Sequence, residues 1–362
     1  MSAIKFKNLV DMQQKSVAAF GPRPLFGTKE NGTWNWMTYA EFGQRVDAFR
    51  GGLAAQGMGK GDTIAIIAAN RYEWAIAAYA AYGLGARFCP MYEHQLEKEW
   101  LFIVNDSGAK MLIVSSRSIY DRVKDWPKEN AHLKSVCCMA LPKEDPQSFL
   151  ALEQAGRDKP VPVAELSPSD VSGFIYTSGT TGNPKGVLLS HENFVSNVNA
   201  CHEVFPLDPE DRTLSFLPWA HSFGQTVELH VMMSMGCSVA IAEAVEKLID
   251  NLAEVKPTIL VSVPRIFNRI YDAVHKKMAE AGGLKKKLFD AAVANEGRRR
   301  KLFEAGKSSL GANLKGKLLD KLVFSKIRAR FGGRLRYAFS GGAALSPDVA
   351  EFIDRIGVLV YE

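Results

Sequence analysis

The chain has 362 residues, of which 47% are hydrophobic and 23% charged, and its formal net charge is +6. This length and balance are typical of a folded globular protein and exclude intrinsic disorder as the expected state. No secretory signal and no run of about 18 apolar residues is present, so we expect a cytoplasmic protein. The cysteines lack C-x-x-C spacing, which favours free thiols over a zinc site, and we assign no metal ligands.

Helices and buried strands alternate through the first part of the chain. Thr38 and Glu41 have the spacing of a capping box and predict a helix that extends to about Gln56. The apolar run 62–68 predicts a strand that is buried on both faces. This alternation predicts an α/β fold with a largely parallel sheet. Further helices are expected over 71–84, 95–106 and 117–125, and further strands over 110–114 and 136–140.

A segment with three prolines and five charged residues, 156–170, predicts a boundary between two lobes, about 1–160 and 161–362. Ser346 and Pro347 predict the start of a last helix, with the hydroxyl of Ser346 as its cap. In the second lobe we expect strands at 212–217, 237–241, 258–263 and 335–339, and helices at 222–235, 245–255 and 264–278.

Positive charge is concentrated between His275 and Arg336, where eighteen Lys and Arg stand against five Asp and Glu. One interpretation is a solvated face of amphipathic helices, and the other is contact with an anionic membrane surface. No aromatic stacking platform is interleaved with the charges, which disfavours nucleic acid as a partner. The helical spacing that favours a solvated face is that of Leu318, Leu319, Leu322, Val323 and Ile327.

The stretch 174–190, FIYTSGTTGNPKGVLLS, has ends typical of strands and a middle that cannot form one. Its middle supplies hydroxyls, bare backbone N–H groups and the charge of Lys185, which together suit a polyphosphate. Gly186 replaces the Ser or Thr of a Walker A loop, and the G-x-G start of a dinucleotide site is missing. An ordinary turn is the alternative. The candidate phosphate-binding residues are Thr177, Ser178, Gly179, Thr180, Thr181, Gly182 and Lys185.

The stretch YTSGTTGNPKGVLLSH resembles the signature of the adenylate-forming (AMP-binding) superfamily, which includes acyl-CoA synthetases, luciferases and the adenylation domains of peptide synthetases. The resemblance implies the large N-terminal domain of these enzymes. That domain has two packed lobes, each with a mixed or parallel sheet flanked by helices, and an active-site crevice between them. The resemblance covers nearly the whole chain through 36–39, 59–62, 217–221, 262–265 and 340–346.

In such enzymes a carboxylate attacks the α-phosphate of ATP, and the thiol of CoA then displaces AMP from the acyl adenylate. The resemblance implies ATP, Mg²⁺ and CoA as cofactors, and catalytic roles for Thr177, Lys185 and His221. His221 would lie beside the reacting carboxylate, although a cap at a helix start is the alternative. The resemblance further implies that Gly341, Gly342 and Ala343 pack on adenine, and that Trp219, His221, Phe223 and Gly224 shape an acyl channel.

Each of these two assignments has a structural alternative. The residues 340–343 could form an ordinary strand-to-helix turn, and Trp219, Phe223 and Gly224 could pack in the core. The stretch FLPWAHSFGQTVELH and the basic helical segment over about 275–330 resemble long-chain acyl-CoA synthetases. The predicted activity is therefore that of a long-chain fatty-acid–CoA ligase. The alternatives are another adenylate-forming ligase, for aryl, medium-chain or amino acids, and a non-catalytic nucleotide-binding fragment.

Relatives continue with a Gly-Tyr-Gly-x-Thr-Glu turn where this chain reaches Tyr361 and Glu362. We therefore expect a truncated chain that lacks the magnesium-binding Glu of that turn, the ribose-binding Asp, and the small C-terminal domain with its catalytic Lys. Such a chain is expected to be inactive by itself. The expected partners are a fatty acid, ATP, CoA and an anionic membrane surface contacted peripherally.

Overall fold

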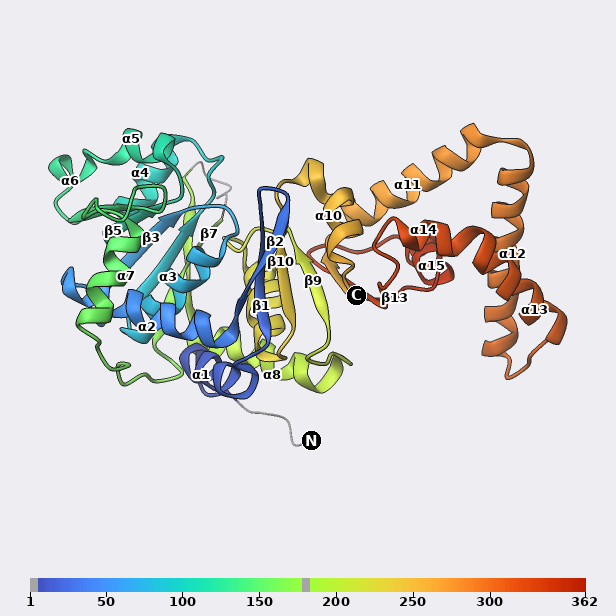
Figure 1. Ribbon diagram of the computed structural model, residues 1–362, viewed down its shortest axis with the longest axis horizontal. Coiled ribbons are helices and arrows are strands. Elements are labelled where there is room, and N and C mark those ends of the chain that lie inside the picture. The colour runs from blue at the N-terminus through green and yellow to red at the C-terminus, as the bar shows by residue number, and fades with distance from the viewer. Residues whose placement is uncertain (1–5, 178–182) are drawn as a thin grey trace. The chain divides into compact units, whose positions relative to one another are not determined.

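A computed structural model of the chain describes residues 6–177 and 183–362. The fold is α/β, with sheets flanked by helices as predicted (Figure 1). The chain forms two compact units: a first unit of Met1–Glu210 and Leu217–Ile241, and a second unit of Asp211–Phe216 and Ala242–Glu362. The segment 160–167 contains neither helix nor strand, as its prolines suggest. The lobe boundary near 156–170 stays a prediction.

The first unit contains a six-stranded sheet in the order β6-β5-β3-β4-β7-β8. All its neighbouring strands are parallel except β7 and β8, which form an antiparallel pair. Every residue of β3 is buried, which confirms the strand predicted from its continuous apolar run. The strands are β3 (Thr63–Ile67), β4 (Arg87–Met91), β5 (Ala109–Val114), β6 (Ser135–Cys138), β7 (Val171–Thr177) and β8 (Lys185–Ser190).

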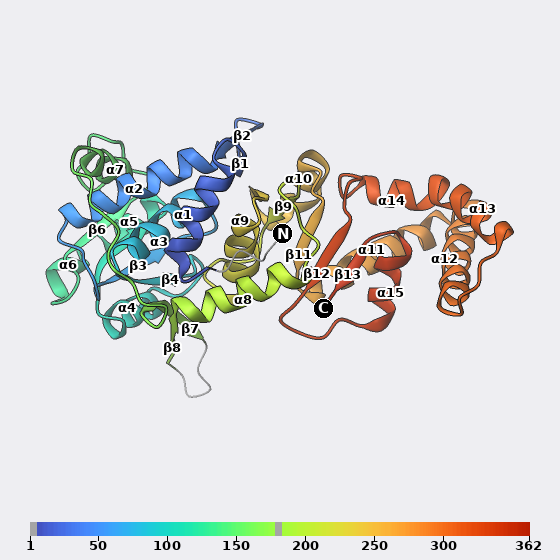
Figure 2. The same cartoon turned by 90° about the horizontal axis from the view of Figure 1, so that it is seen from below.

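Helices cover both faces of this sheet, with α2 and α7 on one side and α4 on the other (Figures 1 and 2). The predicted capping box begins α2: the backbone N–H of Glu41 donates to Thr38 Oγ1 at 3.2 Å, and that of Thr38 donates to Glu41 Oε2 at 2.7 Å. The helices of this unit are α1 (Leu9–Phe20), α2 (Tyr39–Ala55), α3 (Tyr72–Gly83), α4 (Glu97–Asp106), α5 (Arg117–Val123), α6 (Trp126–Glu129), α7 (Phe149–Asp158), α8 (His191–Val204) and α9 (Met232–Ser234).

Several elements of the first unit were not predicted, among them α1, α7, α8 and β4. A second group of strands was also missed in part: β1 (Pro24–Glu30) lies parallel to β10 (Ser238–Ile241) and antiparallel to β2 (Thr33–Thr38). Only β10 of this group was predicted. The helix expected over 222–235 is present, but Gly224–Val231 forms a π-helix, η1, before α9.

The second unit contains four parallel strands in the order β13-β12-β11-β9. These are β9 (Arg212–Ser215), β11 (Ile259–Ser262), β12 (Tyr337–Ser340) and β13 (Leu359–Tyr361). Its helical elements are η2 (Val245–Lys247), α10 (Leu248–Val255), α11 (Pro264–Ala281), α12 (Gly283–Glu304), α13 (Leu310–Leu319), η3 (Asp320–Phe324), α14 (Ser325–Ala329) and α15 (Pro347–Arg355).

Two predictions for the second unit need correction. The hydroxyl of Ser346 makes no capping bond, although Ser346 is the N-cap residue and its carbonyl accepts the N–H of Ala350 at 2.9 Å. Pro347 presets the backbone of the first turn without that bond. The apolar face expected over 318–327 is not continuous, since Leu318 and Leu322 are 59% and 41% exposed. The π-helical turn η3 shifts the helix phase there and turns Phe324 inward instead.

Candidate functional site

The hairpin of β7 and β8 carries the sequence singled out for phosphate binding (Figure 2). Thr177 and Lys185 are cross-strand partners at its end, and both are exposed. Lys185 forms no ion pair with any residue in the described ranges, so its ammonium is available to an anion. The remaining predicted residues of this loop lie outside the described residues: Ser178, Gly179, Thr180, Thr181 and Gly182.

Tyr176 anchors the end of this hairpin to the last residue of helix α4, and sequence reasoning did not identify it. Its hydroxyl donates to Asp106 Oδ2 at 2.6 Å, and burial together with this carboxylate raises the pKa of Tyr176. Tyr176 lies opposite Gly186, where an added Cβ would come within 2.8 Å of the tyrosine ring. The Tyr176 ring thus leaves no room for a side chain at position 186, which explains the glycine after Lys185. The hydrogen bond to Asp106 holds this ring, and with it strand β7, in place.

His221 precedes the first turn of the helix that continues into η1. Its Nδ1 accepts the backbone N–H of Phe223 at 3.2 Å, so the side chain does cap the helix. With Nδ1 as acceptor, the neutral ring carries its proton on Nε2, and the residue is exposed. Capping and a site role are therefore compatible, because the cap orients the ring and leaves an N–H donor free for a ligand.

The other predicted channel residues lie close to His221 but differ in exposure. Trp219 is fully buried, with Trp74 and Phe26 ring centroids at 5.6 and 5.8 Å. Gly224 is also buried, and an added Cβ there would lie 2.4 Å from the carbonyl oxygen of Pro218. The close approach requires glycine at the start of η1. The structure thus places Trp219 in the core, while its role in an acyl channel stays a prediction.

A cluster of buried polar side chains, the His230 cluster, packs around η1 and was missed by sequence reasoning. Tyr79 Oη and His230 Nδ1 are 2.7 Å apart, and Gln225 Nε2 donates to the hydroxyl of Tyr82 at 3.0 Å. His191 stacks edge-on against Tyr82 at 5.7 Å. Burial lowers the pKa of His230 to about 3 and that of His191 to about 4. Both rings are therefore neutral at pH 7.

Three atoms of the His230 cluster have no hydrogen-bond partner among the described residues: His230 Nε2, His191 Nδ1 and Gln225 Oε1. Buried polar atoms are rarely left unpaired, so such a set calls for a ligand or bound water. A π-helix is uncommon and is frequently found at functional sites. His191 ends the YTSGTTGNPKGVLLSH stretch, which is the one sequence signal that pointed toward this cluster.

In the second unit, the predicted adenine turn follows β12 directly. The N–H of Gly341 donates to the carbonyl of Ser262, at the end of the neighbouring strand β11, at 3.2 Å. Gly342 has φ +83°, a left-handed conformation that disfavours any side chain, and both Gly342 and Ala343 are exposed. The Ser340 hydroxyl is buried and has no partner among the described residues. Ligands of parallel sheets bind at such carboxyl ends of strands.

These features fit a nucleotide. In the second unit, the bare turn at Gly341 and Gly342 suits a flat ring, and the buried Ser340 hydroxyl has no partner among the described residues. In the first unit, Lys185 has no ion pair with a described residue and suits a phosphate. No group of three or more His, Cys, Asp or Glu within residues 6–177 and 183–362 could hold a metal ion. Within the same ranges, no helix is long and apolar enough to span a membrane.

Comparisons with known proteins agree with this geometry. The family model described as AMP-binding enzyme matches residues 13–362. Long-chain-fatty-acid–CoA ligase FadD15 of Mycobacterium bovis is 31% identical over 339 residues, which are 92% of this chain and 56% of that protein. The peroxisomal long chain acyl-CoA synthetase 6 of Arabidopsis thaliana is 32% identical over 337 residues, 89% of this chain and 46% of that protein.

Among solved structures, the adenylation domain of a carboxylate reductase from Mycobacterium chelonae superimposes with a TM-score of 0.76 at 18% identity. The match covers 98% of this chain and 57% of that one. This likeness shows a shared fold. The chain spans about half the length of the curated relatives it matches.

Proposed function

The chain belongs to the AMP-binding enzyme family, and we propose that the protein containing it activates long-chain fatty acids with ATP and transfers the acyl group to CoA. The ligase class follows from the family. The long-chain substrate is supported by relatives named as long-chain acyl-CoA ligases at 31% and 32% identity. Because the chain spans about half of their length, the complete activity is assigned to a longer protein, and we expect the 362 residues alone to form no acyl-CoA.

The observation that carries the proposal is the ammonium of Lys185, which lies opposite Thr177 and has no ion pair among the described residues, at the end of the hairpin whose sequence has the family signature. In the proposed first step a carboxylate oxygen of the fatty acid bonds to the α-phosphorus of ATP. The bond from that phosphorus to the bridging oxygen breaks, and pyrophosphate leaves with the electron pair. Lys185 would hold the β- and γ-phosphates, where a point charge stabilises the charge that builds up on the leaving group.

In the proposed second step the sulfur of CoA bonds to the acyl carbon, the bond to AMP breaks, and the thiol proton is lost to solvent or a base. The chain's contribution is positioning. His221 would donate its Nε2–H to the carboxylate or acyl oxygen, with Phe223 and Gly224 beside it. Gly341, Gly342 and Ala343 would pack against adenine, because no side chain at Gly342 obstructs the ring.

Mg²⁺ is part of the proposal as a companion of ATP. It is usually held by one or two carboxylates together with substrate phosphates, which does not demand a cluster of three protein ligands. When bound, it would neutralise phosphate charge. No ligand to it is assigned here among the described residues, and no step above depends on it.

We also propose a cytoplasmic enzyme that contacts anionic membranes peripherally through the segment from His275 to Arg336. Leu310, Leu314 and Leu318 on α13 are 83%, 69% and 59% exposed at four-residue spacing. Exposed Lys315 and Lys317 lie between them. Apolar residues flanked by lysines suit the boundary between lipid headgroups and acyl chains.

The test of the proposed chemistry is Lys185→Ala in a chain extended to the full length of its relatives. Pyrophosphate release with ATP and palmitate should fall by about a hundredfold or more, because a charge that stabilises the leaving group is lost. Lys143→Ala, another exposed lysine without ion pairs to described residues, is the matched control and should keep full activity. Thermal unfolding should be unchanged in both variants.

Equal adenylation by the Lys185→Ala variant and the wild type would refute the assignment of Lys185. Faster turnover of acetate or benzoate than of palmitate would refute the long-chain assignment while leaving the ligase intact. Thioester formation by residues 1–362 alone would contradict the expected inactivity of this chain.

A further inference from the structure

Helix α11 has an apolar side that nothing in the second unit covers fully. It spans 18 residues, yet only Pro264 and Phe267 among them are buried. Its opposite side packs well, since Tyr271 and His275 lie against Phe352 with ring centroids 5.2 and 5.1 Å apart. The partly exposed apolar residues recur every four positions along one stripe: Ile266, Ile270, Val274 and Met278.

This stripe forms one wall of a groove within the second unit. The groove has a volume of about 710 Å³, inside the range of roughly 300–1,000 Å³ that is common for small-molecule sites. Its floor is apolar and buried, with Leu252 and Leu260 both 1% exposed. Toward solvent the apolar lining continues through Ile249 and Leu322, which are 47% and 41% exposed. The groove is therefore mainly apolar and opens at the surface.

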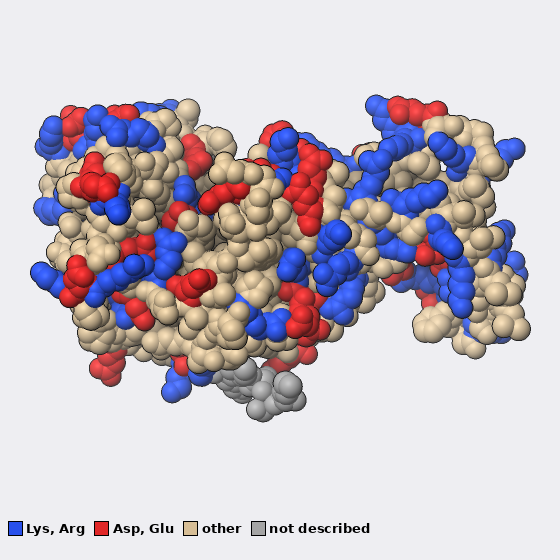
Figure 3. All heavy atoms as spheres, viewed as in Figure 1, with Lys and Arg blue, Asp and Glu red and all other residues tan. Residues whose placement is uncertain are grey.

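The charges that line the groove all have one sign. Five cations line it and no Asp or Glu does: Arg269, Lys277, Lys285, Lys326 and Arg330. None of the five forms an ion pair with a carboxylate in the described part of the chain. Figure 3 shows Lys and Arg side chains predominating over the helices α11 to α14. The groove thus combines an apolar interior with an uncompensated positive rim.

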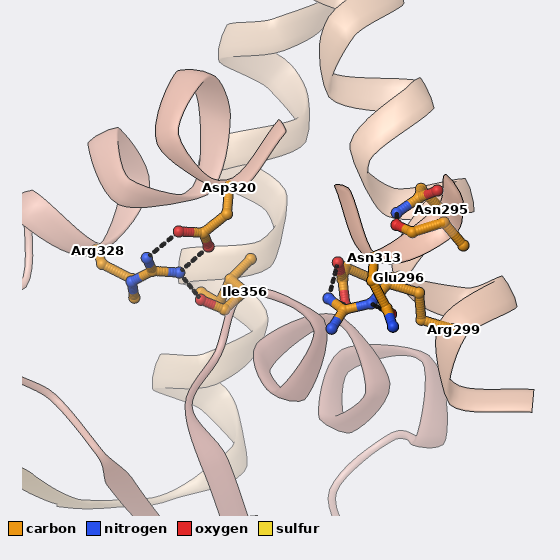
Figure 4. A network of polar contacts seen from close by, with 8 residues as sticks. Asn295, Glu296, Arg299, Asn313, Asp320, Arg328 and Ile356 are labelled. Carbon is orange, nitrogen blue, oxygen red and sulfur yellow. Dashed lines mark hydrogen bonds and ion pairs between the residues drawn. The ribbon is translucent and has the colours of Figure 1, made fainter. Parts of the chain in front are cut away.

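Some cations that lie close in sequence to the groove lining, but outside it, are paired with carboxylates. Arg328 donates to both carboxylate oxygens of Asp320 at 2.7 and 2.8 Å and to the carbonyl of Ile356 at 2.7 Å (Figure 4). Arg299 likewise donates to Glu296 at 2.7 Å. Lys326 and Arg330 flank Arg328 at two residues on either side but have no such partners in the described ranges. Acidic partners are present on these helices, but not at the groove.

We propose that this groove binds one long-chain fatty acid as its anion, with the alkyl chain between α10, α11 and η3 and the carboxylate at the cationic rim. A soluble polyanion would leave the apolar walls in water, and a neutral lipid would leave the rim charges without a counterion. The lining residues include none of the residues assigned to ATP or to the acyl channel. The site is therefore a second acyl site, and the inference does not rest on the proposed ligase activity.

The first test is a fluorescence titration of the chain with the dansyl-labelled fatty acid 11-(dansylamino)undecanoic acid, followed by competition. Palmitate should displace the probe at lower concentrations than methyl palmitate, because the ester lacks the charge. Octanoate should compete much more weakly, since each methylene that enters an apolar site is worth about fourfold in affinity. Equal competition by palmitate and its methyl ester overturns the proposal.

Helix α12 supplies a matched pair of variants for the rim. Lys285 lines the groove, whereas Lys287, two residues or about 200° farther round the helix, does not. Lys285→Glu should weaken probe binding by roughly threefold to tenfold, and Lys287→Glu should leave it unchanged despite the same change in net charge. Equal effects from the two variants would show attraction by overall charge and overturn a site at the groove.

Location is tested by photolabelling with a diazirine-bearing palmitate and mapping of the labelled peptides. Label within α11 or within 320–331 that palmitate suppresses supports the site. Label confined to the first unit overturns it, even if the ligase assignment holds, and labelling of both regions supports two acyl sites. A groove occupied instead by a second copy of the chain would show as concentration-dependent dimerisation that palmitate does not affect, which also overturns the proposal.

Discussion

Mild acid should destabilise the first unit through two buried histidines. His230 is 0% and His191 1% exposed, and burial lowers the pKa of each from 6.5, to about 3 and about 4. In the unfolded chain both rings regain an ordinary pKa. As the pH falls below 6.5, the rings therefore become protonated in the unfolded state while they stay neutral in the folded state. Stability from the two neutral rings is fully present above pH 6.5 and is lost progressively toward pH 4.

The size of this loss follows from the two pKa values. At pH 5 both rings are still neutral in the folded state, while the unfolded rings are mostly protonated. Because pH 5 lies about 1.5 units below the pKa of the unfolded rings, protonation stabilises the unfolded state by about 2 kcal/mol per ring between pH 7 and pH 5. Together the rings account for about 4 kcal/mol, a large share of a typical stability of 5–15 kcal/mol. His230 Nε2 and His191 Nδ1 have no hydrogen-bond partner among the described residues, so no acceptor would stabilise a proton added to either atom.

Urea unfolding at pH 7 and pH 5, followed by tryptophan fluorescence, measures this effect, because all six tryptophans lie in the first unit. His191→Gln and His230→Gln should each reduce the difference in unfolding free energy between the two pH values by about 2 kcal/mol. His132→Gln removes an exposed histidine and should leave the difference as it is in the wild type. If all three variants keep the wild-type pH dependence, the buried rings are not the cause.

Two further predictions concern packing and membranes. Gly156→Ala should destabilise the first unit by about 3 kcal/mol or more, because its Cβ would lie 1.7 Å from the carbonyl oxygen of Ala48 across the α2–α7 contact. Gly59→Ala has open space and should be neutral; equal urea midpoints for the two variants would disprove the packing argument. For membrane contact, the chain should sediment with anionic but not neutral liposomes at low salt and be released at high salt. Equal sedimentation with both lipid types contradicts it.

Local signals in the sequence were sufficient for much of the fold. The capping box at Thr38 and the uniformly apolar run at Thr63–Ile67 specify their elements without distant contacts. The missed hairpin of β1 and β2 also had a local signal, since Asn31 and Gly32 both have positive φ, 50° and 80°, the conformation of an Asn-Gly turn. By contrast, η1 is surrounded by residues of α3 and α8, which are far from it in the sequence, so no local pattern could predict it.

The candidate site divides in the same way. The strand ends of the stretch 174–190 were predicted from their own residues, and Lys185 lies opposite Thr177 without an ion pair among the described residues. Its role in phosphate binding stays a prediction. Tyr176 was not singled out because its partner Asp106 is 70 residues away in the sequence. The burial of Trp219 likewise depends on Trp74 and Phe26. Local structure that depends on neighbouring residues in the sequence was predictable, whereas contacts between residues far apart in the sequence were not.

The basic segment shows why a charge count and a helical spacing do not locate a site. Counting places thirteen more cations than anions between His275 and Arg336, but it treats Arg328 and Arg330 alike. The fold distinguishes them: Arg328 is held by Asp320 eight residues earlier, while Arg330 lines the groove. The π-helical turn η3 adds a residue to one turn, so that Leu322 lines the groove rather than joining the core with Leu319. The change of helical phase at η3 therefore places Leu322, which was expected in the core, in the apolar lining of the groove.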